Sequence, residues 1–345
     1  MVMELVSNPC QAPGPDSTAR FSRFSLPTML SNKWEKSRMV IHPKLVGRSC
    51  YHKYEVEPGL FTPGDFIQVD PKDSLDELGV PRDLSGLRAL DIGAWDGPFT
   101  FELERRGAQV TALDIQDPDV TVFNAVKEIK NSSATYVRGS VYDALPETLG
   151  TFDVVLFAGV YYHLKNPVRS LQCIRTLLKD EGALFIEGAS ATDYLAEQLN
   201  EALALPRSKI GVTAEILDRL PICYFDAEHR IYKHWSNWWF PTTRCLEAIL
   251  QDSGFRNVNL ELKRNAFCNY SGRRLMGRAQ ADPAKPDPGE QKYEHIVATT
   301  NDTAEPFQSI PDPIRAGRFD RLLSLLPPAL HPTARQIRRV VRRLL

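Results

Sequence analysis

The chain has 345 residues, enough for one large domain with additions or for two small ones. Its hydrophobic fraction of 43% and charged fraction of 25% are typical of a globular protein in water. The formal net charge of −1 provides no overall basic field to attract nucleic acid, and no apolar run approaches the roughly 18 residues that span a bilayer.

The N-terminal residues and the cysteines bear on the compartment. Glu4, Pro9 and Pro13 stand where a secretory signal would need an apolar core. The six cysteines are scattered and form no Cys-x-x-Cys pair, which argues against metal ligation and against a disulfide framework. We therefore expect a cytoplasmic protein with reduced thiols and no bound metal.

Two segments are expected before the main domain. Residues 1–45 are rich in proline and small polar residues, which predicts an irregular N-terminal arm. Residues 46–85 are predicted to form a flap, in which Pro58-Gly59 and Pro63-Gly64 mark turns. A cover over a ligand site and an edge hairpin packed on the core are equal alternatives for this flap.

The stretch from Leu87 to Thr100 predicts a buried strand, a turn and the start of a helix. The turn contains Gly93 and Gly97, whose lack of a Cβ lets the backbone approach a ligand closely. About twenty residues later a second short strand ends at Asp114, where an acid suits the two hydroxyls of a ribose. An ordinary strand-to-helix turn is the alternative.

The spacing of this turn excludes the common phosphate-binding loops. Asp91-x-Gly93-x-x-x-Gly97 is neither the Gly-x-Gly-x-x-Gly of dinucleotide sites nor the Gly-Lys-Ser/Thr ending of phosphate loops. A nucleoside without phosphates is therefore the better ligand. S-adenosylmethionine fits that description.

Three further strands are expected in the same domain, at 134–138, 152–159 and 183–187. Apart from Asp153, the run at 152–159 is continuously apolar, as a central parallel strand requires. Ser140 follows the first of these strands, and ends of this kind commonly face the ligand. Five strands alternating with helices predict a doubly wound α/β sheet over residues 86–280.

An insert at 190–240 interrupts this alternation. Two helical patterns lead into Tyr224–Pro241, where aromatic and polar residues mix without a helical or strand period. This composition favours the lining of an acceptor pocket, with a lid helix as the alternative. Thr242 or Thr243 then begins a helix, and strands follow at 257–263 and 272–278, the last antiparallel.

The C-terminal part changes in composition. Prolines mark a linker at 281–310, and residues 311–345 form a basic tail. Residues 334–345 place apolar residues at helical spacing opposite five arginines, so this helix can contact an anionic membrane surface, such as the inner face of the cell membrane. Docking on the protein itself and a solvated tail are the alternatives.

With these motifs in place, residues 46–278 resemble the class I S-adenosylmethionine-dependent methyltransferases. Within that family the chain is similar to the group related to the bacterial enzyme that carboxymethylates wobble uridine in tRNA. The resemblance implies a Rossmann-like, seven-stranded, mostly parallel sheet with an antiparallel last strand. The motifs that carry it are Tyr51-His52, Pro58-Gly59, Thr62-Pro63-Gly64, Asp91-Ile-Gly93-x-Trp95-Asp96-Gly97, Asp114, Gly159-Val-x-Tyr162-His163, Trp238–Thr243, Leu246 and Gly254-Phe255.

The patterns and the resemblance together give a set of expected contacts with S-adenosylmethionine. These are Asp91, Gly93, Trp95, Asp96, Gly97, Asp114, Ile115, Ser140, Val141 and Gly159.

The resemblance also raises the question of a carboxylated cofactor. In the uridine-modifying relative, carboxy-S-adenosylmethionine is held by a Lys, by a Tyr after the fourth strand and by an Arg near the end of the fold. Tyr162 matches that Tyr, whereas Lys53 and Arg274 match only loosely. We therefore expect the plain cofactor. Since Ser140 replaces the usual acid after the third strand, Asp143 or backbone groups would recognise the adenine.

Methyl transfer needs the acceptor in line with the sulfonium and a base to remove its proton. His163, with Tyr162 beside it at the end of the fourth strand, is the expected base, because the pKa of histidine lies nearest neutrality. A buried histidine with satisfied hydrogen bonds is the alternative. The further acceptor candidates are His52, Lys53, His229, His234, Asn237, Trp238 and Arg274.

Three functions follow from the sequence. The first is O-methylation of a small molecule or glycan, for which a lipid-linked sugar would suit the basic tail. The second is tRNA wobble-uridine modification, against which the near-neutral charge argues. The third is a partner subunit that binds the cofactor without catalysis.

Overall fold

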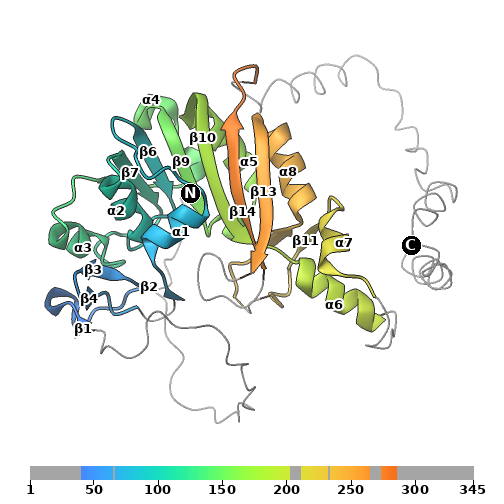
Figure 1. Ribbon diagram of the computed structural model, residues 1–345, viewed down its shortest axis with the longest axis horizontal. Coiled ribbons are helices and arrows are strands. Elements are labelled where there is room, and N and C mark those ends of the chain that lie inside the picture. The colour runs from blue at the N-terminus through green and yellow to red at the C-terminus, as the bar shows by residue number, and fades with distance from the viewer. Residues whose placement is uncertain (1–39, 65–66, 203–210, 232–233, 265–272, 286–345) are drawn as a thin grey trace, which may run out of the picture. The chain divides into compact units, whose positions relative to one another are not determined.

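The computed structural model describes residues 40–64, 67–202, 211–231, 234–264 and 273–285. Seven strands form its main sheet, in the spatial order β13-β14-β10-β9-β6-β7-β8 (Figure 1). Their bounds are β6 Arg88–Ile92, β7 Gln109–Asp114, β8 Thr135–Arg138, β9 Phe152–Ala158, β10 Leu178–Ala189, β13 Phe255–Arg264 and β14 Arg273–Ala281.

The strand directions confirm the expected α/β fold. Strands β6 to β10 pair in parallel, and β14 is antiparallel to both β10 and β13. The sheet is thus Rossmann-like and mostly parallel, and β14, the last strand among the described residues, is the antiparallel one. β14 lies inside the sheet and β13 forms the edge.

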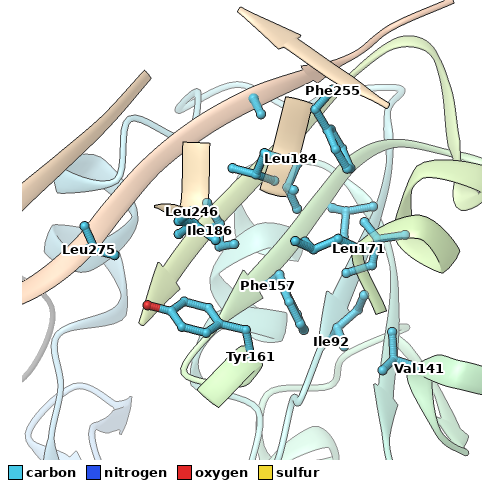
Figure 2. Close-up of a cluster of buried hydrophobic side chains, with 14 of the residues drawn as sticks. Ile92, Val141, Phe157, Tyr161, Leu171, Leu184, Ile186, Leu246, Phe255 and Leu275 are labelled. Atoms are coloured by element: carbon cyan, nitrogen blue, oxygen red, sulfur yellow. The ribbon is translucent and has the colours of Figure 1, made fainter. Parts of the chain in front are cut away.

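Helices cover both faces of this sheet. Leu103 of α2 packs in one buried cluster with Val154 and Leu156 of β9. Leu171 of α5 packs in another with Phe157 of β9 (Figure 2). Burial on both faces explains why β9 is apolar from Val154 to Ala158. The helices are α1 Pro71–Glu77, α2 Pro98–Arg105, α3 Phe123–Ile129, α4 Pro146–Leu149, α5 Pro167–Leu177, α6 Thr192–Ala202, α7 Ala214–Asp218 and α8 Thr243–Asp252.

Capping residues fix the starts of the helices near the site. Asn166 accepts a hydrogen bond from the Arg169 amide at 3.1 Å, and Pro167 occupies the first position of α5. Thr242 accepts from the Cys245 amide at 3.2 Å and begins α8, as expected. The predicted start of a helix at Thr242 is confirmed.

The order of the strands locates a natural ligand site. β6 pairs with β7 on one side and with β9 on the other, so the winding of the chain reverses between β6 and β9. Ligands of open α/β sheets bind beside the carboxyl ends of the strands at such a switch point. The loops that follow β6, β7 and β9 therefore surround the expected site.

The predicted flap consists of short strands and one helix. β1 (Val40–Ile41), β3 (Glu55–Glu57) and β4 (Leu60–Phe61) form one small sheet, and β2 (His52–Lys53) pairs with β5 (Ile67–Gln68). Helix α1 was not expected, although Asp70-Pro71 is a regular start signal: Asp70 accepts from the Asp73 amide at 3.0 Å. A 3-10 turn at Pro43–Leu45 lies in the range predicted as irregular arm, so described structure begins before residue 46.

The insert differs from its prediction in one respect. β11 (Cys223–Phe225) and β12 (Trp239–Pro241) pair antiparallel at the two ends of the aromatic stretch, where neither strand nor hairpin was expected. The strands are only three residues long, too short for a period of two to be recognised. The helical patterns before them are confirmed as α6 and α7.

The predictions for residues 1–39, for most of the linker and for the basic tail lie outside the described residues. β14 extends to Ala281, the first residue of the predicted linker. Among the described helices, none is long and apolar enough to cross a membrane.

Candidate active site

The loop after β6 is held close to its neighbours by two glycines. Gly93 and Gly97 have φ of +79° and +86°, a conformation that other residues rarely adopt. A Cβ on Gly93 would lie 2.4 Å from Cγ2 of Val160, and one on Gly97 would lie 2.5 Å from Cε2 of Phe101. The glycines are therefore required by packing inside the protein, beyond any contact with a ligand.

Asp114 joins the end of β7 to this loop. One carboxylate oxygen accepts from the Trp95 amide at 2.9 Å, and the other accepts from the Gln116 amide at 2.9 Å. Each oxygen of an ionised carboxylate can accept a second hydrogen bond, so two ribose hydroxyls can still be bound. Beside it, Trp95 and Ile115 are 37% and 63% exposed, so both present apolar surface near Asp114.

Asp91 lies beneath the loop and is buried. It accepts a hydrogen bond from the Thr100 hydroxyl. Burial raises the pKa of Asp91 to about 7, and the nearby Asp114 carboxylate contributes in the same direction. The loop from Gly93 to Gly97, called the cofactor loop below, thus follows a carboxyl group that titrates near neutrality.

This shift predicts a pH dependence of stability. Since the pKa of Asp91 is raised on folding, its contribution to the free energy of unfolding is full below about pH 4 and is lost as the pH rises to about 7. Between about pH 5.5 and 7 the loss should be roughly 1.5 kcal/mol. Asp91→Asn should remove this component in urea unfolding curves, whereas the exposed control Asp119→Asn should retain it. Equal slopes against pH for wild type and Asp91→Asn would contradict the assignment.

Asp96 connects the loop to the flap. Its buried carboxylate accepts from the His52 amide at 2.8 Å and from the Cys50 thiol at 2.7 Å, and it also contacts the His52 ring. Its backbone carbonyl accepts from the Tyr54 hydroxyl at 2.6 Å. The expected role of the Asp96 carboxylate as a cofactor ligand is therefore replaced by anchoring of the flap. His52, an acceptor candidate, is its main partner.

The hydrogen bonds that anchor the flap to Asp96 lead to a prediction about local exchange. Asp96→Ala leaves buried donors without a partner, and hydrogen bonds to charged groups contribute about 1.5–3 kcal/mol each. Amide exchange of His52 should therefore accelerate by roughly 100-fold, while the core of β9 is unchanged. Glu55→Ala, in the same flap, is the control. Unchanged exchange at His52 in Asp96→Ala would show that the anchor does not hold the flap.

Ser140 and Val141 follow β8, and Gly159 follows β9. The hydroxyl of Ser140 accepts from the Tyr142 amide at 3.2 Å, and Val141 is part of the core. The Ser140 hydroxyl thus stabilises the turn, and the Val141 side chain packs in the core. Gly159 has φ of +75° and donates its amide to the Glu187 carbonyl at 3.0 Å.

Tyr162 follows in a 3-10 turn (Tyr161–His163) and belongs to a buried polar cluster. Its hydroxyl lies 3.2 Å from Nη2 of Arg274, and that guanidinium pairs with Glu187 on β10. Arg274 and Glu187 are 2% and 1% exposed. The expected Tyr162 and Arg274 do meet, whereas Lys53 lies on β2 of the flap. Burial raises the pKa of Tyr162 to about 12, so its hydroxyl stays protonated.

The presence of Glu187 changes the role of Arg274. An Arg that holds a carboxylated cofactor must offer an uncompensated charge, and here the neighbouring carboxylate already neutralises it. Arg274, expected to bind substrate, is instead buried in an ion pair. Sequence analysis missed Glu187, although an acid at the end of an apolar strand indicates a buried cationic partner.

His163 ends the same turn. Its Nδ1 lies 2.9 Å from the Ser236 hydroxyl, and that hydroxyl lies 2.8 Å from Nδ1 of His234. Desolvation by the surrounding protein lowers the pKa of His163 to about 4, although the residue reaches the surface, and the charges of His234 and Arg274 add to the effect. The ring is neutral at pH 7, as a proton acceptor must be.

The aromatic insert is hydrogen-bonded directly to this turn. The Trp238 amide donates to the Tyr162 carbonyl at 2.7 Å, and the Trp239 indole donates to the Lys165 carbonyl at 3.1 Å. The insert thus lies beside the turn that follows β9.

Its side chains form a partly exposed aromatic surface. The ring of Trp238 stacks on Phe225 with 5.9 Å between ring centres, and its centre lies 4.7 Å from that of His229. The ammonium group of Lys165 lies over the face of the Trp238 ring. Asn237 is 3% exposed, and its side-chain oxygen has no hydrogen-bond partner among the described residues. A buried amide oxygen of this kind is a suitable acceptor for a ligand hydroxyl.

Comparison with known proteins identifies methyltransferases of similar sequence. The chain is 32% identical to the ubiquinone biosynthesis O-methyltransferase of Xanthomonas oryzae pv. oryzae over 119 residues, 34% of this chain. The match spans about half (49%) of that relative's length. It is 25% identical to the tRNA U34 carboxymethyltransferase of Pseudoalteromonas translucida over 234 residues, 68% of this chain and 61% of that protein.

Among solved structures, the N-terminal domain of EvdMO1 with S-adenosylhomocysteine bound aligns with a TM-score of 0.47 at 17% identity. The alignment covers 71% of this chain and all of that domain. The family model described as "Methyltransferase domain" matches residues 65–260, more than half of the chain. The strand-to-helix loop, the acid at the end of β7 and the turn after β9 all lie within that range, and the chain belongs to this methyltransferase family.

Proposed function

We propose that the protein uses S-adenosylmethionine to methylate a hydroxyl group of a small molecule or glycan. The observation that carries this proposal is His163. It is a neutral imidazole on the turn after β9, and Val160 of that turn packs on Gly93 of the cofactor loop. A base at this place can take the proton of a hydroxyl while its oxygen attacks the methyl group.

The cofactor is the plain one in this proposal. Asp114 would hold the ribose, the exposed Trp95 and Ile115 would border the adenosyl group, and Gly93 would lie beside the methionine part. The Glu187–Arg274 pair supports this choice, since it provides no free cation for an additional carboxylate.

The acceptor would bind on the aromatic insert. Phe225 is 45% exposed and Trp235 is 73% exposed, and ring faces of this kind bind the apolar faces of sugars and other rings. The unpaired side-chain oxygen of Asn237 would accept a hydrogen bond from an acceptor hydroxyl. The basic tail at 334–345 would bring the protein to an anionic membrane surface if the acceptor is lipid-linked.

Wobble-uridine modification of tRNA is the second candidate. The tRNA U34 carboxymethyltransferase relative favours it, because that similarity extends over 68% of the chain. The net charge of −1 and the neutralised Arg274 count against it.

A labelling experiment separates the two candidates. The protein is incubated with S-adenosylmethionine carrying a tritiated methyl group, in parallel with a cell extract of small molecules and glycans and with unmodified total tRNA. We expect label in the extract and none in tRNA. His163→Gln should lower the turnover number by roughly 100-fold, and the exposed control Glu147→Ala should not. Label in tRNA alone, or full activity of His163→Gln, would contradict the proposal.

A further inference from the structure

Two imidazole rings and one hydroxyl lie in a row at the mouth of the site. Nδ1 of His163, Oγ of Ser236 and Nδ1 of His234 are joined by contacts of 2.9 Å and 2.8 Å. His163 comes from the turn after β9, and the other two come from the aromatic insert. Two elements far apart in the sequence thus meet through one hydroxyl group.

The backbone of Ser236 fixes the protons in this row. Its carbonyl oxygen lies 3.2 Å from Nδ1 of His163, and since a carbonyl can only accept, that nitrogen carries a hydrogen. Its amide nitrogen lies 3.4 Å from Nδ1 of His234, and since an amide can only donate, that nitrogen carries the lone pair. The Ser236 hydroxyl then accepts from His163 and donates to His234, so all four contacts agree.

This tautomer leaves the lone pair of His163 on Nε2. We propose that Ser236 and His234 are positioning residues, which hold His163 in the tautomer whose Nε2 takes the proton of the acceptor. The inference rests on the proposed methyl transfer. Without this row, either ring nitrogen of a neutral histidine can carry the hydrogen.

Methyl transfer to the acceptor involves one bond formed, one bond broken and one proton moved. The acceptor oxygen forms a bond to the methyl carbon, the bond from that carbon to sulfur breaks, and its electron pair remains on the sulfur of S-adenosylhomocysteine. The hydroxyl proton passes to Nε2 of His163. The resulting imidazolium donates from Nδ1 to both oxygens of Ser236, whose hydroxyl is polarised by its own donation to His234. The proton on Nε2 then leaves to water.

The surroundings favour a base that is regenerated readily. The ring of Tyr162 packs on His163 at 4.3 Å between ring centres, and the ring of His234 lies at 6.0 Å. Desolvation and the charge of Arg274 disfavour the imidazolium, and the hydrogen bond to the Ser236 carbonyl opposes them.

Nitrogen-15 NMR of the histidine rings tests this arrangement on the resting protein, without any acceptor. At pH 7 we expect the hydrogen of His163 on Nδ1 and that of His234 on Nε2, with His163→Gln and His234→Gln used for assignment. The opposite tautomer on His163 would overturn the proposal. This result is independent of methyl transfer, so it is separate from a failure of the proposed function, which would show as no label transfer by the wild type.

Kinetics supply the second measurement, with the labelled acceptor of the extract as probe. Ser236→Ala should lower kcat by roughly 10-fold with KM unchanged, because the hydroxyl acts through His163. Ser236→Thr keeps the hydroxyl and should restore most of kcat. A Ser236→Ala variant that folds like the wild type and keeps its kcat would overturn the role of the hydroxyl.

Discussion

Asp114→Ala should weaken the binding of S-adenosylhomocysteine by at least roughly 100-fold. Two hydrogen bonds from ribose hydroxyls to a carboxylate contribute about 1.5–3 kcal/mol each, and the substitution removes both. It also removes the acceptor that holds the Trp95 amide in the cofactor loop. Isothermal titration calorimetry with the wild type and the variant measures the effect directly.

Two further variants make this result specific. Asp117→Ala removes an acid that lies three positions after Asp114 and pairs with Arg138 at the surface. This variant should bind the ligand as the wild type does. Asp114→Asn keeps the size of the side chain but points an amide N–H at a backbone amide, so it should bind as weakly as the alanine variant. A dissociation constant for Asp114→Ala within a few-fold of the wild type would refute the assignment.

Glu187→Ala should destabilise the fold by about 3–5 kcal/mol. It leaves the guanidinium of Arg274 buried without its carboxylate, and removal of one partner from a buried ion pair costs this much. The hydroxyl of Tyr162, 3.2 Å from the guanidinium, is neutral and cannot replace the charge. Urea unfolding at pH 7 measures the loss.

The double variant Glu187→Leu/Arg274→Met provides the control. Replacing both charges by apolar side chains removes the desolvation cost as well as the attraction, so much of the stability should return. Arg82→Ala, which breaks an exposed pair with Asp76, should change little. If Glu187→Ala unfolds at the same urea concentration as the wild type, Arg274 has another counter-charge.

The elements of the sheet were predictable because their signals are local. β9 is apolar from Val154 to Ala158, α5 has Asn166-Pro167 at its start, and the glycines after β6 identify a turn. Helix α1 carried an equally local signal in Asp70-Pro71, which was overlooked. The two short strands that enclose the aromatic insert have no pattern long enough to recognise.

The site was predictable only in part, because its partners are far apart in the chain. Asp96 was expected to contact the cofactor, yet the Asp96 carboxylate is bound by residues of the flap, more than forty positions away. Arg274 was assigned to substrate, yet Glu187 neutralises it across neighbouring strands. Ser236 contacts His163 across 73 positions, a pairing that only the folded chain reveals.

A crystal structure with S-adenosylhomocysteine tests the central claim most directly. We predict the ligand at the carboxyl ends of β6, β7 and β9, with both ribose hydroxyls hydrogen-bonded to Asp114 and the sulfur on the side of His163. A ribose held by other residues, or a ligand outside the loops after these strands, would contradict the account.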